Sequence, residues 1–105
     1  MIRHIVMWKL RPGPPAQRQA DIARLREGFL GLRGRIPGLV HLEIGLDTSL
    51  VDYACDVVLY SEFDSQEALQ AYANHPAHLA VRDALVGVRI DRHQVDYEPV
   101  ETAAP

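Results

Sequence analysis

Residues 2–10, with the sequence IRHIVMWKL, alternate between two sets of apolar side chains. Successive side chains of a strand point to opposite faces, so His4 and Trp8 would share one face. Ile5 and Met7 would share the other face, which is also apolar. This alternation predicts a strand, and we expect both of its faces to be at least partly covered by other parts of the protein.

The remaining sequence predicts a succession of further helices and strands. The proline-rich segment 11–15 ends the first strand, and apolar residues then recur three or four positions apart, as in an amphipathic helix. A second helix is predicted to have Asp64 as its N-cap and Glu67 completing a capping box. Pro76 ends that helix and begins another. In chain order, we expect a strand over 2–10, a helix over 16–35, strands over 39–46 and 53–63, helices over 65–73 and 76–86, and a strand over 89–97.

This order of elements indicates an α+β fold of the split βαβ, or ferredoxin-like, type. The βαββαβ succession predicts a four-stranded antiparallel sheet with the helices on one face. The opposite face is too apolar to be left in water, since it carries Ile5, Met7, Val58 and Tyr60. We therefore expect a homodimer in which two such sheet faces meet.

Length and composition exclude several classes of protein. The 105 residues suit one domain, which we expect to span residues 1–97 before a C-terminal tail over 98–105. A net charge of −3 leaves no broad basic surface, so no nucleic-acid partner is expected. No run of about 20 apolar residues is present, so no membrane partner is expected either. The single cysteine, Cys55, permits no intrachain disulfide and fits a reducing, cytoplasmic location.

Several short motifs together resemble one known family. They are His4 with Trp8 on the first strand, the sequence IPGL at 36–39, EF at 62–63, and ALQAYANHPAH at 68–78. These residues resemble the stress-responsive dimeric α/β-barrel (Dabb) family over about residues 2–97. The most specific part is Tyr-x-x-His-Pro-x-His at 72–78. The resemblance implies a ferredoxin-like monomer that dimerises through its sheet into a barrel.

One branch of that family suggests a chemistry. Its plant polyketide cyclases, of the olivetolic acid type, close a poly-β-keto thioester by an intramolecular aldol reaction without metal or cofactor. The resemblance implies that His78 and Tyr72 would carry the acid–base chemistry, with His4 as a third catalytic residue. The branch also has a histidine on the third strand, where this chain has Val57. The set of cyclase residues is therefore incomplete in this chain, and we do not assign the cyclase substrate to it.

The residues themselves support the same two candidates. An imidazole titrates near neutral pH, so His78 is suited to act as a general base. Tyr72 is suited to orient it or to donate a hydrogen bond to a carbonyl that becomes an enolate. The helix break at 74–76 allows the two side chains to converge. The structural alternative is that Tyr72 only packs against the sheet while His78 satisfies a local backbone group.

A ligand pocket is expected on the face of the first strand that carries His4. It would lie between the sheet and the helices and would hold a small, largely apolar molecule. The alternative for His4 is a core histidine that is hydrogen-bonded to a neighbour. The residues expected to contact the ligand are Trp8, Phe29, Val57, Leu59 and His75.

Three functions remain open from the sequence. The first is a cyclase-like enzyme that works on a polyketide-like or aromatic ligand. The second is a non-catalytic, stress-responsive dimer that binds a ligand in the same pocket. The third is a cofactor-free monooxygenase of the related dimeric barrels. His75 and His78 have a spacing that can bind metal, but no third ligand is evident, so neither a metal nor a cofactor is expected.

Overall fold

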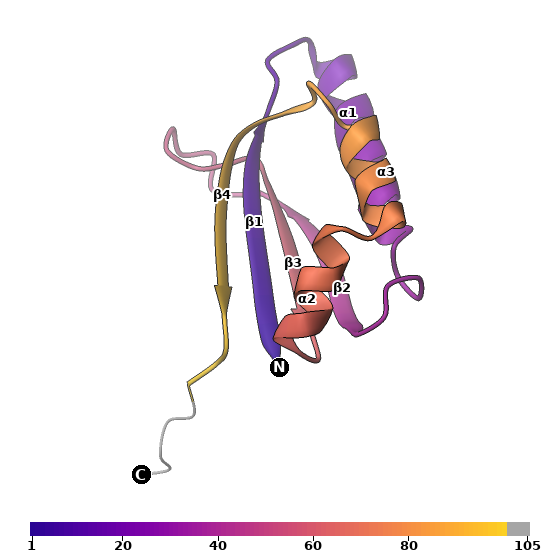
Figure 1. Cartoon of the computed structure of the whole chain (residues 1–105). Coiled ribbons are helices and arrows are strands. Elements are labelled where there is room, and N and C mark those ends of the chain that lie inside the picture. Colours follow the sequence, from indigo (N-terminus) through magenta and orange to yellow (C-terminus); the bar gives the residue numbers. More distant parts are fainter. Residues whose placement is uncertain (101–105) are drawn as a thin grey trace.

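The structure, a computed structural model, describes residues 1–100. Three helices cover one face of a four-stranded antiparallel sheet, whose strand order is β2-β3-β1-β4 (Figure 1). This arrangement confirms the predicted ferredoxin-like fold. The elements are β1 (Ile2–Leu10), α1 (Pro15–Leu30), β2 (Leu39–Leu46), β3 (Val57–Phe63), α2 (Gln66–Ala73), α3 (Pro76–Ala84) and β4 (Arg89–Tyr97). Of the predicted tail, residues 101–105 lie outside the described residues.

Strand β1 lies inside the sheet and separates its two faces. It pairs with β3 from Ile2 opposite Phe63 to Trp8 opposite Val57, and with β4 on its other side. All of its even-numbered residues are buried beneath the helices, whereas its odd-numbered residues are half-buried or exposed on the outer face. The predicted alternation is therefore correct, and it directs His4 and Trp8 towards the helices.

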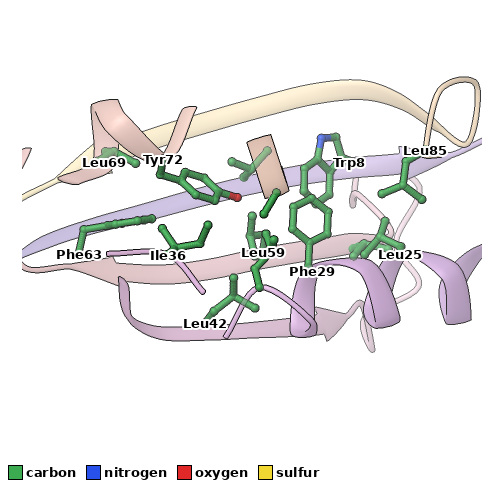
Figure 2. Packing of buried hydrophobic residues seen from close by; sticks show 14 of the residues in the cluster. Trp8, Leu25, Phe29, Ile36, Leu42, Leu59, Phe63, Leu69, Tyr72 and Leu85 are labelled. Atoms are coloured by element: carbon green, nitrogen blue, oxygen red, sulfur yellow. The ribbon is translucent and has the colours of Figure 1, made fainter. Parts of the chain in front are cut away.

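The core lies between the sheet and helix α1. Phe29 of α1 stacks on Trp8 of β1, with 5.5 Å between ring centroids and 23° between the ring planes (Figure 2). Leu25, Phe29 and Leu59 are almost completely buried. Burial of such side chains contributes roughly 1.5–3 kcal/mol each, so this layer supplies much of the stability of a domain this small.

Helix α1 ends at Leu30, five residues earlier than the sequence predicted. Gly31 is its C-cap, and Gly34 has a φ of +76°, a left-handed conformation that ends helices and favours glycine. Within the helix, Gly28 lies against Val81 of α3, where an added Cβ would come within 3.1 Å of a Val81 methyl group. The absence of a side chain at position 28 thus lets the two helices pack closely.

Two other predicted boundaries were wrong. Strand β3 begins at Val57, because residues 53–56 form part of the loop that precedes it. The N-cap of α2 is Ser65 and not Asp64, since the Ser65 hydroxyl accepts a hydrogen bond of 3.1 Å from the Ala68 backbone N–H.

An ion pair between the half-exposed Arg11 and the buried Asp21 connects the loop after β1 to helix α1. The Arg11 guanidinium donates two hydrogen bonds to the Asp21 carboxylate, at 2.9 and 3.0 Å. The Asp21 side chain is 2% exposed. Hydrogen bonding to Arg11 lowers the pKa of Asp21, although burial opposes this effect. The pair therefore stabilises the folded chain with Asp21 ionised.

Within residues 1–100, no element covers the outer face of the sheet. Ile5, Val58 and Tyr60 are half-buried at its centre, and Met7 is exposed. Strand β4 extends this apolar surface with Val95, which is 50% exposed. None of the helices in residues 1–100 has the length and apolar character needed to cross a bilayer.

The Asp21–Arg11 pair predicts a pH-dependent stability. Asp21→Asn should lower the melting temperature at pH 7, because it removes the charge that Arg11 binds in the buried site. Since the native pKa of Asp21 is lowered, its contribution is complete above the unfolded-state value of about 3.9 and disappears as the pH falls through the native pKa. Thermal unfolding of both proteins between pH 7 and pH 2 should show their melting curves converging on the acid side.

The matched control for this test is Asp83→Asn. Asp83 pairs with Arg82 at 3.5 Å on the surface, where its side chain is 70% exposed. Such a pair contributes little, so this variant should melt like the wild type at pH 7. Equal melting of Asp21→Asn and wild type at pH 7 would contradict the role given to the buried pair.

Candidate functional site

The site begins at the break between helices α2 and α3. His75 has an extended backbone (φ −68°, ψ 134°), and its Nδ1 accepts a hydrogen bond of 3.0 Å from the Ala77 backbone N–H. Pro76 begins α3, where its missing N–H costs nothing. The chain therefore turns between Tyr72 and His78, and their ring centroids lie 4.3 Å apart.

These residues border a cleft between the helices and strand β4. The cleft has a volume of about 310 Å³, and α2, α3, β1 and β4 all contribute to it. A cavity of about 30 Å³ adjoins it, and His4, Tyr72, His78 and Arg92 line both spaces. The smaller cavity extends to the aromatic core, since Trp8, Phe29 and Leu59 also line it.

Tyr72 presents a buried polar group to this site. Its side chain is 3% exposed, and its hydroxyl has no hydrogen-bond partner among the described residues. The hydroxyl points along the core layer in the direction of Trp8 (Figure 2). Burial raises the pKa of Tyr72 to about 12, so the phenol stays protonated at neutral pH and acts as a hydrogen-bond donor.

His78 is held in one tautomer. Its Nδ1 lies 3.2 Å from the Ala73 carbonyl oxygen, and a carbonyl only accepts, so Nδ1–H donates. The lone pair therefore lies on Nε2. Burial lowers the pKa of His78, and the positive charges of Arg82, Arg89 and Arg92 lower it further, against the opposing effect of the Ala73 bond. A neutral imidazole with a free Nε2 is the form that accepts a proton.

His4 makes a close contact with Asp96 of strand β4. His4 Nδ1 and Asp96 Oδ1 are 2.5 Å apart, so Nδ1–H donates a hydrogen bond to the carboxylate. When the ring is neutral, Nε2 therefore carries no proton. The other oxygen of Asp96 accepts a bond of 3.0 Å from the Gln94 side chain, and Gln94 in turn accepts one from Arg92. The ring of His4 is buried and lies 6.2 Å from that of Tyr72.

No part of residues 1–100, the cleft included, gathers three or more histidine, cysteine, aspartate or glutamate side chains in a geometry that would hold a metal ion. The groups in the cleft are instead an imidazole, a phenol and a His–Asp pair. Such groups transfer protons and bind oxygen atoms of a ligand.

Comparison with known proteins supports the assignment of a family. The stress-responsive A/B barrel domain (Dabb) family matches residues 2–99. The chain belongs to this family. The uncharacterized protein SCO4036 of Streptomyces coelicolor is 36% identical over 80 residues, which are 76% of this chain and 81% of the relative.

Solved structures agree with this membership of the Dabb family. A dimeric Bacteroides fragilis protein of unknown function and ferredoxin-like fold is 32% identical, with a TM-score of 0.83 over 92% of this chain and 94% of the other. A Mesorhizobium loti Dabb family protein is 27% identical, with a TM-score of 0.72 over 95% and 97% of the two chains. These similarities give the fold and show that a structural neighbour is dimeric, but they name no ligand.

Most of the residues predicted for the site of this Dabb protein do come together. His4, Tyr72 and His78 line the cleft, whereas Trp8, Phe29 and Leu59 line the adjoining cavity. Two do not line either space. Val57 is buried beside the loop that precedes β3, and the His75 side chain caps helix α3.

The sequence analysis missed the residues that strand β4 supplies. Asp96, Gln94 and Arg92 line the cleft, and Arg89 lines the smaller cavity. The DRHQVDY sequence at 91–97 reads as a polar, exposed strand, and no local pattern indicates that alternate side chains face a histidine and a tyrosine. Only the pairing of β4 with β1 shows which of these side chains lie next to His4 and Trp8.

The unpartnered phenol predicts an unusual effect on stability. Tyr72→Phe should raise the free energy of unfolding by about 1 kcal/mol, because a buried hydroxyl without a partner is unfavourable and the ring packing is retained. Urea unfolding of wild type and variant measures the difference. Tyr53→Phe is the control, since Tyr53 is 84% exposed and removal of its solvated hydroxyl should bring no gain. A loss of stability in Tyr72→Phe would contradict the description of this hydroxyl.

Proposed function

We propose that this Dabb protein is a homodimer that binds a small, largely apolar carbonyl compound in the cleft and catalyses proton transfer next to the carbonyl. The observation that carries the proposal is the buried Tyr72 hydroxyl without a partner, beside a His78 that is neutral at physiological pH. A hydroxyl of this kind is unfavourable for folding unless a ligand oxygen accepts its hydrogen bond.

The proposed reaction is an intramolecular aldol closure. Nε2 of His78 removes a proton from the carbon next to a ketone, and the resulting enolate oxygen accepts a hydrogen bond from Tyr72. The enolate carbon then attacks a second carbonyl of the same molecule, which forms one carbon–carbon bond. The resulting alkoxide takes the proton back from His78. The proposed reaction requires no oxidant, reductant or metal.

His4 is assigned a supporting role in this scheme. Asp96 fixes the orientation of its ring, as a carboxylate does for a catalytic histidine. Its Nε2 is then available to the ligand, either as an acceptor for an acidic proton or, when the ring is protonated, as a donor to a carbonyl oxygen. Trp8, Phe29 and Leu59 would provide the apolar surface for the remainder of the ligand.

The homodimer is supported by the uncovered outer face of the sheet. Ile5, Met7, Val58 and Tyr60 form an apolar centre there, on the side opposite to the helices. Structural neighbours of the same fold are described as dimeric. Two such faces packed together would remove these side chains from water, and the cleft on the inner face would stay open.

The catalytic proposal predicts a strong effect at His78. A panel of aromatic β-keto acids and their thioesters is followed by NMR, which records both exchange of the α-protons for deuterium and ring closure. With a compound that reacts, His78→Ala should reduce kcat by about 100-fold or more, since general-base catalysis is lost. Tyr72→Phe should reduce it less. His41→Ala, an exposed histidine on the edge strand β2, is the control and should retain activity.

The pH profile of the same reaction gives a second readout. The neutral imidazole is the active form, and its pKa is lowered, so kcat/KM should begin to fall only below the usual histidine value of about 6.5. Full activity of His78→Ala would leave a ligand-binding protein without catalysis. Consumption of oxygen by the wild type with these compounds would instead favour a cofactor-free monooxygenase.

The proposed dimer predicts the effect of a single charge. Val58→Asp should convert the protein to a monomer, or unfold it, because an unpaired carboxylate would be buried between the two sheets. Sedimentation velocity at micromolar concentration gives the mass of wild type and variant. Val86→Asp introduces the same charge at a residue that is 78% exposed, and it should leave the dimer intact. A monomeric wild type at this concentration would sink the proposal.

A further inference from the structure

Two arginines of strand β4 face the inside of the site. Arg92 pairs with Trp8 and Arg89 pairs with Leu10, and both of these β1 partners are buried on the inner face. Residues three positions apart in a regular strand point to opposite faces. Here the register shifts between Trp8 and Lys9, so one extra residue of β4 lies between the two arginines and both reach the same face.

The backbone is strained at the point where this happens. Asp91 lies between the paired positions and has a φ of +48°, in the left-handed region that few residues other than glycine occupy. Bulges that change the direction of a side chain are frequent next to functional sites, as is backbone strain. The bulge at Asp91 has a clear consequence, which is to add a second guanidinium to the inner face.

The two guanidinium groups lack a counter-charge. Arg89 is half-buried, with its guanidinium carbon 4.7 Å from the centroid of the Trp8 ring. No carboxylate of residues 1–100 lies within 4.0 Å of Arg89 or Arg92 in an ion pair, and the hydrogen bond of Arg92 goes to the neutral Gln94. The nearby Asp96 is already engaged by His4 and Gln94. Arg92 is exposed, but the charge of the half-buried Arg89 is partly removed from water, and such a charge is unfavourable unless it is paired.

We infer that Arg89 and Arg92 form an anion subsite, and that the ligand of the cleft is a carboxylic acid rather than a neutral compound. Guanidinium groups bind carboxylates through paired, charge-assisted hydrogen bonds, and the Trp8 and Phe29 rings hold Arg89 in place by stacking beneath it. Arg92 lines both the cleft and the smaller cavity, so a bound carboxylate would lie beside Tyr72 and His78.

This inference rests on the proposed ligand pocket and narrows its substrate class to small keto acids. The carboxylate would anchor one end of the molecule, and the ketone would extend towards the Tyr72 hydroxyl. Burial lowers the pKa of His78, and the positive charge of Arg89 and Arg92 adds to this effect. The same charge would stabilise the negative charge of an enolate. The same two arginines would therefore contribute to binding and to the electrostatics of the reaction.

A binding experiment tests this without any assay of activity. Trp8 is the one tryptophan of the chain, so its fluorescence reports on the site. We would titrate the protein with 3-phenylpropionate and with its neutral counterpart 3-phenylpropanamide at low ionic strength. The acid should bind at least about tenfold more tightly than the amide. Added salt should weaken the binding of the acid and leave the binding of the amide unchanged.

The variants assign the preference to particular residues. Arg92 lies on an exposed strand, and Arg92→Gln should lower the affinity for the acid to about that for the amide. Arg89→Gln should have the same effect if the variant folds. Arg26→Gln removes the same charge from the exposed side of α1 and should keep the preference for the acid.

Equal binding of acid and amide to the wild type, or a preference that survives in Arg92→Gln, would overturn the anion subsite and leave an apolar pocket. If neither compound changes Trp8 fluorescence or gives heat in a calorimetric titration, the ligand pocket fails as well.

Discussion

The register of strand β1 fixes which side chains face the helices and which face the outside of the sheet. The strand lies between β3 and β4, and its alternation sends His4 and Trp8 to the helices and Ile5 and Met7 to the outer face. A slip of one residue would exchange the two faces completely. His4 would then face the proposed dimer partner, and the apolar outer surface would face the helices. One strand thus determines where the site and the interface can be.

The helices cover the sheet unevenly, and this creates the cleft. Helix α1 packs over the core, but α2 and α3 are short and are separated by the turn at Pro76. Strand β4 remains exposed along nearly its whole length. The cleft therefore has one dry side, where Tyr72 is buried, and one open side, where Arg92 and Asp96 meet solvent. The proposed ligand would enter from the side of β4 and reach groups in a low-dielectric setting.

Several features of this cleft are unfavourable for folding alone. The Tyr72 hydroxyl has no protein partner, Asp91 is left-handed, and Arg89 is half-buried without a carboxylate. They gather in one region, whereas the buried charge elsewhere, Asp21, is fully paired with Arg11. Natural proteins tend to depart from good packing and pairing rules where they bind or react with other molecules. This concentration is the physical ground for placing function at the inner face of β4.

Local sequence was sufficient for the order of the elements, for the strands apart from the start of β3, for the break at Pro76 and for the meeting of Tyr72 with His78. Each follows from periodicity or from proline within a few residues. Local sequence did not distinguish Ser65 from Asp64 as a cap, since both residue types are good N-caps. Only the tertiary structure decided that Asp96 holds His4, that Arg11 neutralises Asp21, and that Arg89 and Arg92 share a face. These contacts depend on how the chain folds back on itself or on a bulge that shifts the strand alternation. Neither is encoded in the spacing of neighbouring residues.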